Sequence, residues 1–541
     1  MKRPCSSRTP FWRRAAESSG RGARTSGACP HPRGSVTVTV LLLMVIFTGL
    51  GLAVLHASGV HMKINAFRRF TALLDCASES GLKRGLRDFT AWLEGTGLAA
   101  PVTDERVESL RAAPGAAFPL LVAEALGPVF PRVLEESFDG MIWSCRTDCG
   151  FGGLEDRGPY LRIAAALRIE SSGGLVRTRP RRLSVLEGSL GLLAGRLPLA
   201  ALPLYIRREM TGTERSDFLA ANAISLRTRP GELVGPGFSA SAGGVLPDDP
   251  SALVAKALNI GVFRPGDLSP AELRQALGLE PSMEPVPEGV YLIVNDLGLG
   301  GVFVEGDLDE MILACDRDAQ VIVFRSGDAV WRLEFSPARS RTSFATPAGS
   351  FDYDLVPLPL ILVNGAVASL GGGAVGPDGR VEIRFDGETP AVLDGVDLTI
   401  VSADRVTISS DLILEGVRWQ DGVPYAKDTT AQLVIYAAGQ DLASGASVEG
   451  GIAVAAGAPA DIKVQASVTA ASGGFLIEGE GKTVEILGAL HADSFEGNGN
   501  ALALVRDDRA AAGVFPANAP LTASPQLAVF SLKVLAWKEY E

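Results

Sequence analysis

The longest uninterrupted apolar stretch of the chain lies near its N-terminus. Residues 36–55 (VTVTVLLLMVIFTGLGLAVL) carry no charge, and no Asp, Glu, Lys or Arg occurs between Arg33 and Lys63. Twenty helical residues rise about 30 Å, which is the thickness of a bilayer hydrocarbon core. The pattern predicts a retained membrane-spanning helix. A removed signal peptide is the alternative, because Ala57-Ser58-Gly59 resembles a small-residue cleavage site.

Beyond the apolar run, apolar residues recur every three or four positions, a spacing that places them on one face of a helix. These positions are Ile64, Phe67, Phe70, Leu74, Ala77, Gly81, Leu82, Leu86, Phe89 and Leu93. We therefore expect one helix over residues 35–97. Its first half would cross the membrane, and its second half would pack against a globular head or neighbouring subunits.

The next two regions show mixed patterns. Residues 98–228 combine short helical patterns with strand-like alternation at Tyr160–Glu170, which predicts a small membrane-proximal α/β region. Residues 229–285 begin with a segment rich in Gly, Pro, Ser and Asp, which is typical of a linker. Within it, Ser269-Pro270-Ala271-Glu272 predicts a capping box that starts a short helix.

The last region, residues 286–541, is predicted to be an all-β domain. Short runs rich in β-branched residues alternate with Gly, Asn or Asp, as at Val290–Val294, Val396–Val401 and Leu433–Tyr436. Small residues dominate the later turns, which favours a right-handed parallel β-solenoid whose coils stack closely. A β-sandwich is the alternative, because the intervals between strands are irregular. The fold class is therefore expected to be α+β.

Charge is distributed very unevenly along the chain. The formal net charge is −12, but residues 1–34 carry eight Lys or Arg against one Glu, which leaves −19 for the remainder. A basic leader before an apolar helix places the N-terminus in the cytoplasm and the body outside the cytoplasmic membrane. An acidic body repels nucleic acid, which we exclude as a partner.

Three short elements in order carry a resemblance to a known family. They are Arg33-Gly34-Ser35, then Thr48-Gly49-Leu50-Gly51-Leu52-Ala53 within the apolar run, then Ser78-Glu79-Ser80-Gly81-Leu82. This arrangement resembles the N-terminal domain of PilX-type assembly proteins of type IV pili, over roughly residues 33–86. The body resembles the uncharacterised β-rich domains that accompany some of these N-termini.

The resemblance implies a minor-pilin-like protein of the inner membrane. A prepilin peptidase would cleave between Gly34 and Ser35, and the helix would contact other pilins or pseudopilins and membrane lipid. Thr39 stands where major pilins carry a glutamate, a departure that PilX-like members share. Glu79 and Gly81 are the family positions. Glu79 would bridge subunits or, as an ordinary exposed carboxylate, pair locally with Lys83.

Catalytic chemistry finds little support. Of four histidines, only His491 lies outside the N-terminal region, and we interpret it as a solvated turn residue. We therefore predict no catalytic residue, cofactor or metal site. Among the exported cysteines, Cys145 and Cys149 are the candidates for a disulfide, with free thiols as the alternative.

These observations predict a single-pass membrane protein of a type IV pilus or related secretion system. It would display a β-rich domain for adhesion or partner contact, at the inner membrane or in a pilus at the cell surface. The alternatives are a single-span adhesin unrelated to pili and a β-solenoid enzyme acting on polysaccharide.

Overall fold

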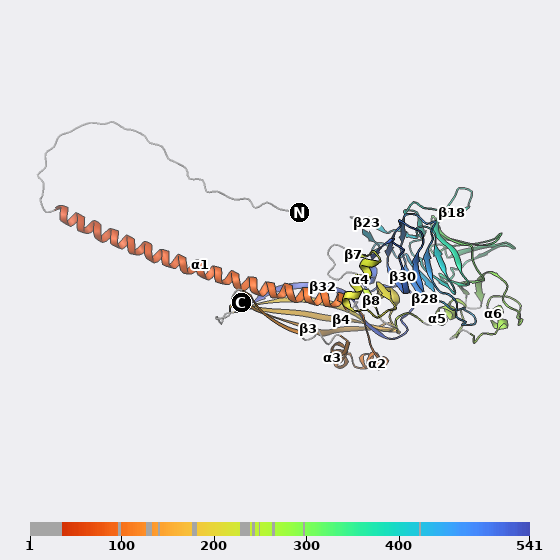
Figure 1. Ribbon diagram of the computed structural model, residues 1–541, viewed down its shortest axis with the longest axis horizontal. Coiled ribbons are helices and arrows are strands. Elements are labelled where there is room, and N and C mark those ends of the chain that lie inside the picture. The colour runs from red at the N-terminus through yellow and green to blue at the C-terminus, as the bar shows by residue number, and fades with distance from the viewer. Residues whose placement is uncertain are drawn as a thin grey trace, which may run out of the picture. The chain divides into compact units, whose positions relative to one another are not determined.

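The computed structural model divides the chain into two compact units, residues 1–72 and 73–541. It describes residues 35–540 except 96–98, 126–131, 139–140, 176–180, 228–237, 241–243, 248, 262–263, 265, 296–297 and 421–422. The long helix α1 is followed by a largely β region with a few short helices (Figure 1). The expected α+β class is confirmed.

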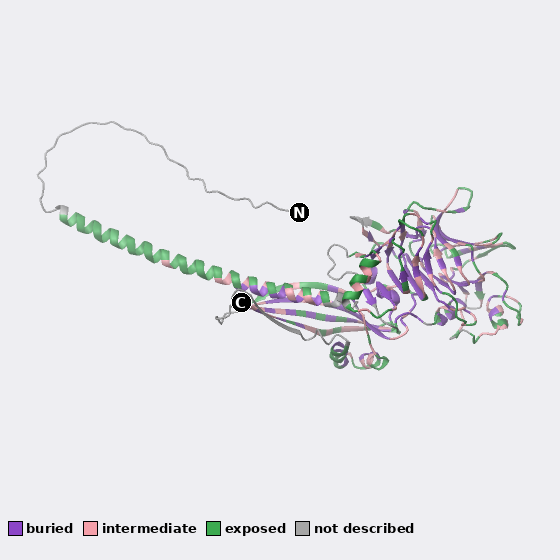
Figure 2. Ribbon diagram, viewed as in Figure 1, coloured by how far each residue is buried: buried purple, intermediate pink, exposed green. Residues whose placement is uncertain are grey.

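The described part of the first unit belongs to a single helix. Helix α1 runs without interruption from Ser35 to Gly95, two residues short of the predicted end. Between Thr37 and Ala91 it is long and apolar enough to cross a membrane or to serve as a signal sequence. Its side chains up to residue 72 are almost all exposed (Figure 2). The hydroxyl of Thr48 donates to the carbonyl of Met44 at 2.7 Å, which satisfies this polar group inside the apolar run.

The second unit begins with an antiparallel sheet against which the last part of α1 packs. The strands follow the order β1 (Ala99–Pro101), β32 (Gln526–Tyr540), β5 (Arg181–Gly195), β4 (Tyr160–Leu175), β3 (Met141–Asp156) and β2 (Arg132–Phe138). Helices α2 (Asp104–Ala112) and α3 (Pro114–Ala125) share one hydrophobic core with α1 and this sheet. The alternation predicted at Tyr160–Glu170 is part of β4, where every second residue is buried.

The rest of the second unit is built mainly from parallel strand pairings. The first series consists of β10 (Gly298–Glu305), β16 (Leu360–Asn364), β20 (Asp397–Ser402), β25 (Gln432–Ala437), β28 (Ser467–Ile477), β30 (Ala489–Glu496), β6 (Leu204–Ile206) and β8 (Phe238–Ala240). The second consists of β11 (Glu310–Asp316), β17 (Val367–Val375), β21 (Val406–Ile408), β26 (Ile452–Val454) and the later half of β28.

A third parallel series completes this arrangement. It consists of β19 (Pro390–Val392), β22 (Ile413–Leu414), β27 (Asp461–Val464), β29 (Thr483–Leu487), β31 (Ala501–Val505) and β7 (Ile224–Arg227), with a Leu412–Val464 bridge beside β22 and β27. The chain visits the three series in turn, so that strands of consecutive turns lie side by side.

Antiparallel strands and short helices complete the second unit. The strands are β9 (Gly289–Asn295), β12 (Ala319–Ser326), β13 (Ala329–Ser336), β14 (Arg341–Thr346), β15 (Gly349–Tyr353), β18 (Val381–Ile383), β23 (Arg418–Gln420) and β24 (Val423–Tyr425). The helices are η1 (Leu199–Ala201), α4 (Gly212–Ala221), α5 (Ser251–Ala257), α6 (Pro270–Ala276) and α7 (Asp508–Ala511). The predicted capping box starts α6, with both reciprocal hydrogen bonds between Ser269 and Glu272 present.

An aligned ladder of apolar side chains forms the core of the parallel region. In register along the first series lie Val302, Ile361, Ile400, Ile435, Val468, Leu490, Leu204 and Phe238. All eight are buried in one continuous cluster. The unequal sequence spacing of these residues reflects loops of different length between strands, and it explains the irregular intervals in the sequence.

Strand pairings cross the predicted boundary between the regions 98–228 and 229–285. Strand β32 from the C-terminus completes the N-terminal sheet beside β5, while β6, β7 and β8 from residues 204–240 pair with the last turns of the parallel region. Strand pairing between segments this distant leaves no local sequence signal. Sequence inspection therefore placed these segments with their neighbours along the chain.

Candidate functional site at the helix–sheet junction

The predicted processing site lies at the edge of the described chain. Gly34 falls outside the described residues, and Ser35 is the first residue of α1. The structure therefore gives the cleavage prediction no geometry of its own.

The second predicted element, around Gly81, lies where α1 meets the sheet. A β-carbon on Gly81 would lie 2.2 Å from Oγ of Ser171 on β4 and 2.9 Å from Cε3 of Trp143 on β3. At Gly85, one turn later, a β-carbon would lie 2.2 Å from Sγ of Cys145. Only glycine lets the helix backbone come this close to the side chains of the sheet, so Gly81 and Gly85 set the distance between α1 and the sheet.

The sheet carries a matching glycine. A β-carbon on Gly173 of β4 would lie 2.3 Å from the backbone nitrogen of Ser78. Beside it, Ser184 of β5 donates a hydrogen bond of 2.9 Å to the hydroxyl of Ser78, and both residues are buried. The close contact of Gly173 with the backbone of Ser78 and the hydrogen bond between Ser184 and Ser78 together fix the position of α1 along the sheet.

Charged residues of the same helix divide into two roles. Glu79 pairs with Lys83 at 2.6 Å, and both side chains are more than a third exposed. Asp75 instead pairs with Arg182 of β5 at 2.9 Å, which ties the helix to the sheet. The local partner foreseen for Glu79 is therefore present, and an exposed pair of this kind contributes little to stability.

The structure does not bring Cys145 and Cys149 together. Both are free thiols on the regular strand β3, opposite Ser171 and Leu167 of β4. Four residues of strand span about 13 Å, whereas bridged Cα atoms lie within about 7 Å. The disulfide candidate therefore requires correction, since its short spacing suggested a loop that does not exist. Burial raises the pKa of Cys145 to about 11 and that of Cys149 to about 12.

The interpretation of His491 as a solvated turn residue was wrong. It lies on β30, fully buried, between Thr469 and Tyr205 of neighbouring strands. Its Nε2 lies 2.6 Å from the carbonyl of Leu202 and its Nδ1 3.0 Å from the hydroxyl of Thr469. Because a carbonyl only accepts, Nε2 carries the proton and Nδ1 accepts from Thr469. Burial lowers the pKa of His491 to about 4, so the ring is neutral.

Acidic residues do not gather into a metal site in the described part of the chain. No group of three or more His, Cys, Asp or Glu side chains there is placed to hold an ion. Asp307 and Asp309, which the sequence places near a strand edge, accept hydrogen bonds from the backbone of Ala366 and Gly327. These carboxylates therefore stabilise turns.

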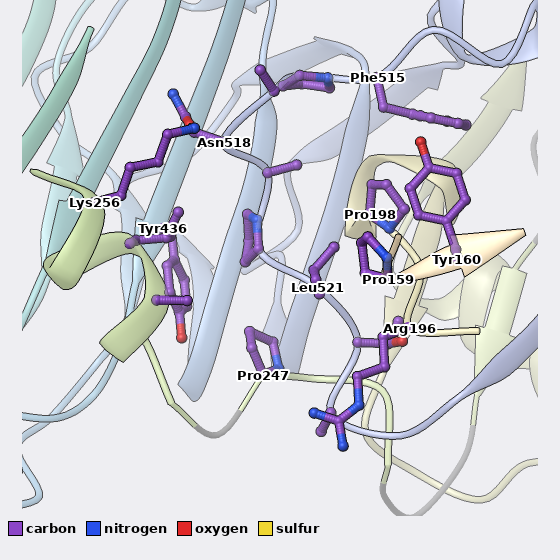
Figure 3. A pocket seen from close by; sticks show the side chains of 18 of the residues that line it. Pro159, Tyr160, Arg196, Pro198, Pro247, Lys256, Tyr436, Phe515, Asn518 and Leu521 are labelled. Atoms are coloured by element: carbon purple, nitrogen blue, oxygen red, sulfur yellow. The ribbon is translucent and has the colours of Figure 1, made fainter. Parts of the chain in front are cut away.

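Sequence inspection missed a pocket of about 750 Å³ in the second unit. Its walls come from the β3–β4 and β5–η1 turns, the segment around α5 and the stretch 515–523 (Figure 3). Apolar and aromatic groups dominate the lining, notably Tyr160, Tyr436 and Phe515. Strand β25 contributes Tyr436 as a fifth segment, and because five segments far apart in the sequence form the pocket, no local motif could have revealed it.

Comparison of the chain with protein-family models, with curated proteins and with solved structures found no match.

Proposed function

We propose that this protein is a minor-pilin-like structural component of a type IV pilus or related secretion system, anchored in the inner membrane. The observation that carries the proposal is the change of character along the single helix α1. Up to residue 72 its apolar side chains are exposed, whereas Leu82 and Phe89 are buried against the sheet. One helix thus serves both as an apolar anchor and as part of a folded head.

The exposed half of α1 needs apolar surroundings. Side chains such as Leu43, Val45 and Phe47 are each about half exposed or more, and water disfavours so large a patch. Lipid or the equivalent helices of other subunits would cover it. Nothing described lies within 4 Å of a β-carbon placed on Gly49 or Gly51, which lie on opposite sides of the helix. Each glycine leaves room for a neighbouring helix to approach closely.

The large β region is best classified as a parallel β-solenoid. Three parallel series, visited in turn and filled by an aligned apolar ladder, support this class over the β-sandwich alternative. Such a region is rigid, because each turn is hydrogen-bonded to the next. It would display surface loops for adhesion or partner contact, a structural role that requires no catalytic step.

The proposed orientation of the chain across the membrane follows from its charge distribution. The basic leader would remain in the cytoplasm, and the acidic body would lie beyond the membrane. A prepilin peptidase would remove the leader between Gly34 and Ser35. The membrane-bound product should then begin at Ser35, as N-terminal sequencing would establish. A product that begins at Met1 contradicts cleavage, and one released from the membrane with a start between His56 and His61 contradicts the anchor.

Incorporation among other subunits can be tested by site-specific photo-crosslinking in the native cell. A crosslinker at Val45, in the exposed half of α1, should capture a second protein that has an apolar N-terminal helix. A crosslinker at Val514 is the matched control, since this valine is also about half exposed but belongs to the body. Capture of lipid alone at Val45 would favour a single-span adhesin instead.

Processing can be tested separately. Gly34→Arg should leave the leader attached and remove the protein from sheared surface filaments. Gly22→Arg, within the same leader, should leave both unchanged. Equal incorporation of the Gly34→Arg variant would contradict the proposed role of cleavage.

A further inference from the structure

The pocket in the second unit has a rigid wall. The stretch 515–523 is fixed by backbone hydrogen bonds of 2.9 Å from Leu199 to Pro520 and 2.8 Å from Thr522 to Leu197. The side chain of Thr522 also accepts from the backbone of Leu197 at 3.0 Å. A cavity of about 750 Å³ whose wall is held in this way is formed before any ligand arrives.

One part of the pocket lining, here called the floor, is rich in proline. Five prolines line it, namely Pro159, Pro198, Pro247, Pro516 and Pro520. Proline has no backbone N–H. In the wall, the carbonyl of Pro520 and the N–H of Thr522 are already hydrogen-bonded to Leu199 and Leu197. The middle of the pocket therefore offers flat ring surfaces, to which Tyr160 and Phe515 add aromatic faces (Figure 3).

Positive charge is found at the two ends of this floor. In Figure 3, Lys256 and Asn518 lie on one side of Leu521, and Arg196 and Tyr160 lie on the other. Lys256 donates to the amide oxygen of Asn518. Arg196 is exposed and forms no ion pair with the described residues.

The other charged lining residues do not cancel this charge. Arg157 pairs with Glu155 at 2.6 Å, outside the lining, and Asp249 caps the backbone of Ser251 at 2.8 Å. Because Arg157 is paired with Glu155, Arg196 and Lys256 are the lining cations left to meet a ligand, against the lining carboxylate Asp249. Asp397, outside the lining, accepts from the N–H of Ala517 and interacts with Lys256. Arg196 is therefore the group best placed to pair with an anionic ligand, with Lys256 as the second.

We propose that this pocket binds an acidic oligosaccharide. Its sugar rings would lie against the proline and aromatic surfaces, and its carboxylates would pair with Arg196 and Lys256. Sugar rings present apolar C–H faces that can pack against flat ring surfaces, while their hydroxyls project from the ring edges and would stay hydrated. An acidic peptide is less suited, because its backbone would require hydrogen-bonding groups that a proline floor lacks. The inference goes beyond the proposed anchoring role, since every lining residue lies between Arg157 and Ala523.

The test uses the full chain in lipid nanodiscs and three probes followed by fluorescence anisotropy. The probes are a fluorescent trimer of galacturonic acid, the neutral trimer maltotriose and the peptide hexaglutamate. We expect saturable binding of the galacturonate trimer that weakens with added salt, and binding of the other two weaker by about tenfold or more.

Variants assign the binding to the pocket. Lys256→Ala should weaken binding of the galacturonate trimer by about tenfold, the loss of one charged hydrogen-bond partner, and Arg196→Glu by at least as much, because it reverses the charge. Arg380→Glu is the matched control, because Arg380 is 84% exposed and does not line the pocket. Leu521→Trp should block binding by filling the middle of the floor.

Folding of each variant is checked by thermal unfolding. Arg196 and Lys256 are exposed, so their variants remain informative even if Leu521→Trp does not fold. The proposal is overturned if the galacturonate trimer does not bind saturably, if maltotriose or hexaglutamate binds as tightly, or if Arg380→Glu weakens binding as much as Arg196→Glu. Crosslinking at Val45 is independent of these outcomes, so failure here leaves the anchoring proposal standing.

Discussion

Gly81 of α1 lies directly against Trp143 of β3, so close that a β-carbon on Gly81 would be 2.9 Å from the indole Cε3. This contact joins the long apolar helix α1 with the antiparallel sheet of the second unit.

Gly81→Ala should destabilise the second unit. The new methyl group would overlap Ser171 and Trp143, and relieving the overlap moves the helix away from the sheet. We expect the free energy of unfolding to fall by about 1–3 kcal/mol, measured by denaturant unfolding in detergent. Gly59→Ala, in the same helix with nothing within 4 Å, is the control and should be neutral or slightly stabilising. Equal stability of the two variants would refute the packing argument.

The cysteines should react in a defined order. Cys76 is exposed, whereas burial raises the pKa of Cys145 to about 11 and the pKa of Cys149 and Cys315 to about 12. Because the thiolate is the reactive form, maleimide at neutral pH should label Cys76 first. After unfolding without reductant, these four of the six cysteines of the chain should all be labelled, as mass spectrometry would show. Recovery of a Cys145–Cys149 disulfide peptide would contradict the strand geometry.

His491 should make stability depend on pH on the acidic side. Its pKa is lowered from 6.5 to about 4, mainly by burial, so the unfolded chain binds the proton more readily than the folded one. The stabilisation is complete above pH 6.5 and is lost as pH falls toward 4. We expect a loss of about 3 kcal/mol relative to His491→Gln over this range, from urea unfolding at several pH values. Parallel pH profiles for the two proteins would disprove this linkage.

Glu305 should act with the opposite sign. Burial raises its pKa from 4.5 to about 7, with smaller contributions from Asp441 and Glu288, while a hydrogen bond from Asn364 opposes the rise. The folded state favours the protonated acid, so stability is lost as pH rises from 4.5 through 7. Glu305→Gln should therefore gain stability relative to the unmodified protein between pH 5 and pH 8.

The control for Glu305 is another glutamate on a strand. Glu382 of β18 is 71% exposed, and Glu382→Gln should leave the pH profile of unfolding unchanged. A profile for Glu305→Gln that parallels the unmodified protein would show that Glu305 is solvated in the folded state.

Local patterns in the sequence determined the elements whose stability is local. The uncharged run and the periodic stripe after it predicted one long helix, and α1 is continuous from Ser35 to Gly95. The capping box at Ser269 was equally secure, because its two hydrogen bonds join residues three positions apart. The alternation of apolar and polar residues at Tyr160–Glu170 located part of β4, because successive side chains of a strand point to opposite faces.

Only the tertiary structure decided what depends on pairing between distant segments. It placed β32 beside β5, buried His491 between Thr469 and Tyr205, and separated Cys145 from Cys149 along a single strand. The pocket lined by Arg196 and Lys256 could not be found from local patterns either, because its lining comes from five segments far apart in the sequence. The physical reason is that strand pairing and burial depend on which backbones meet in space, and sequence separation carries almost no information about that choice.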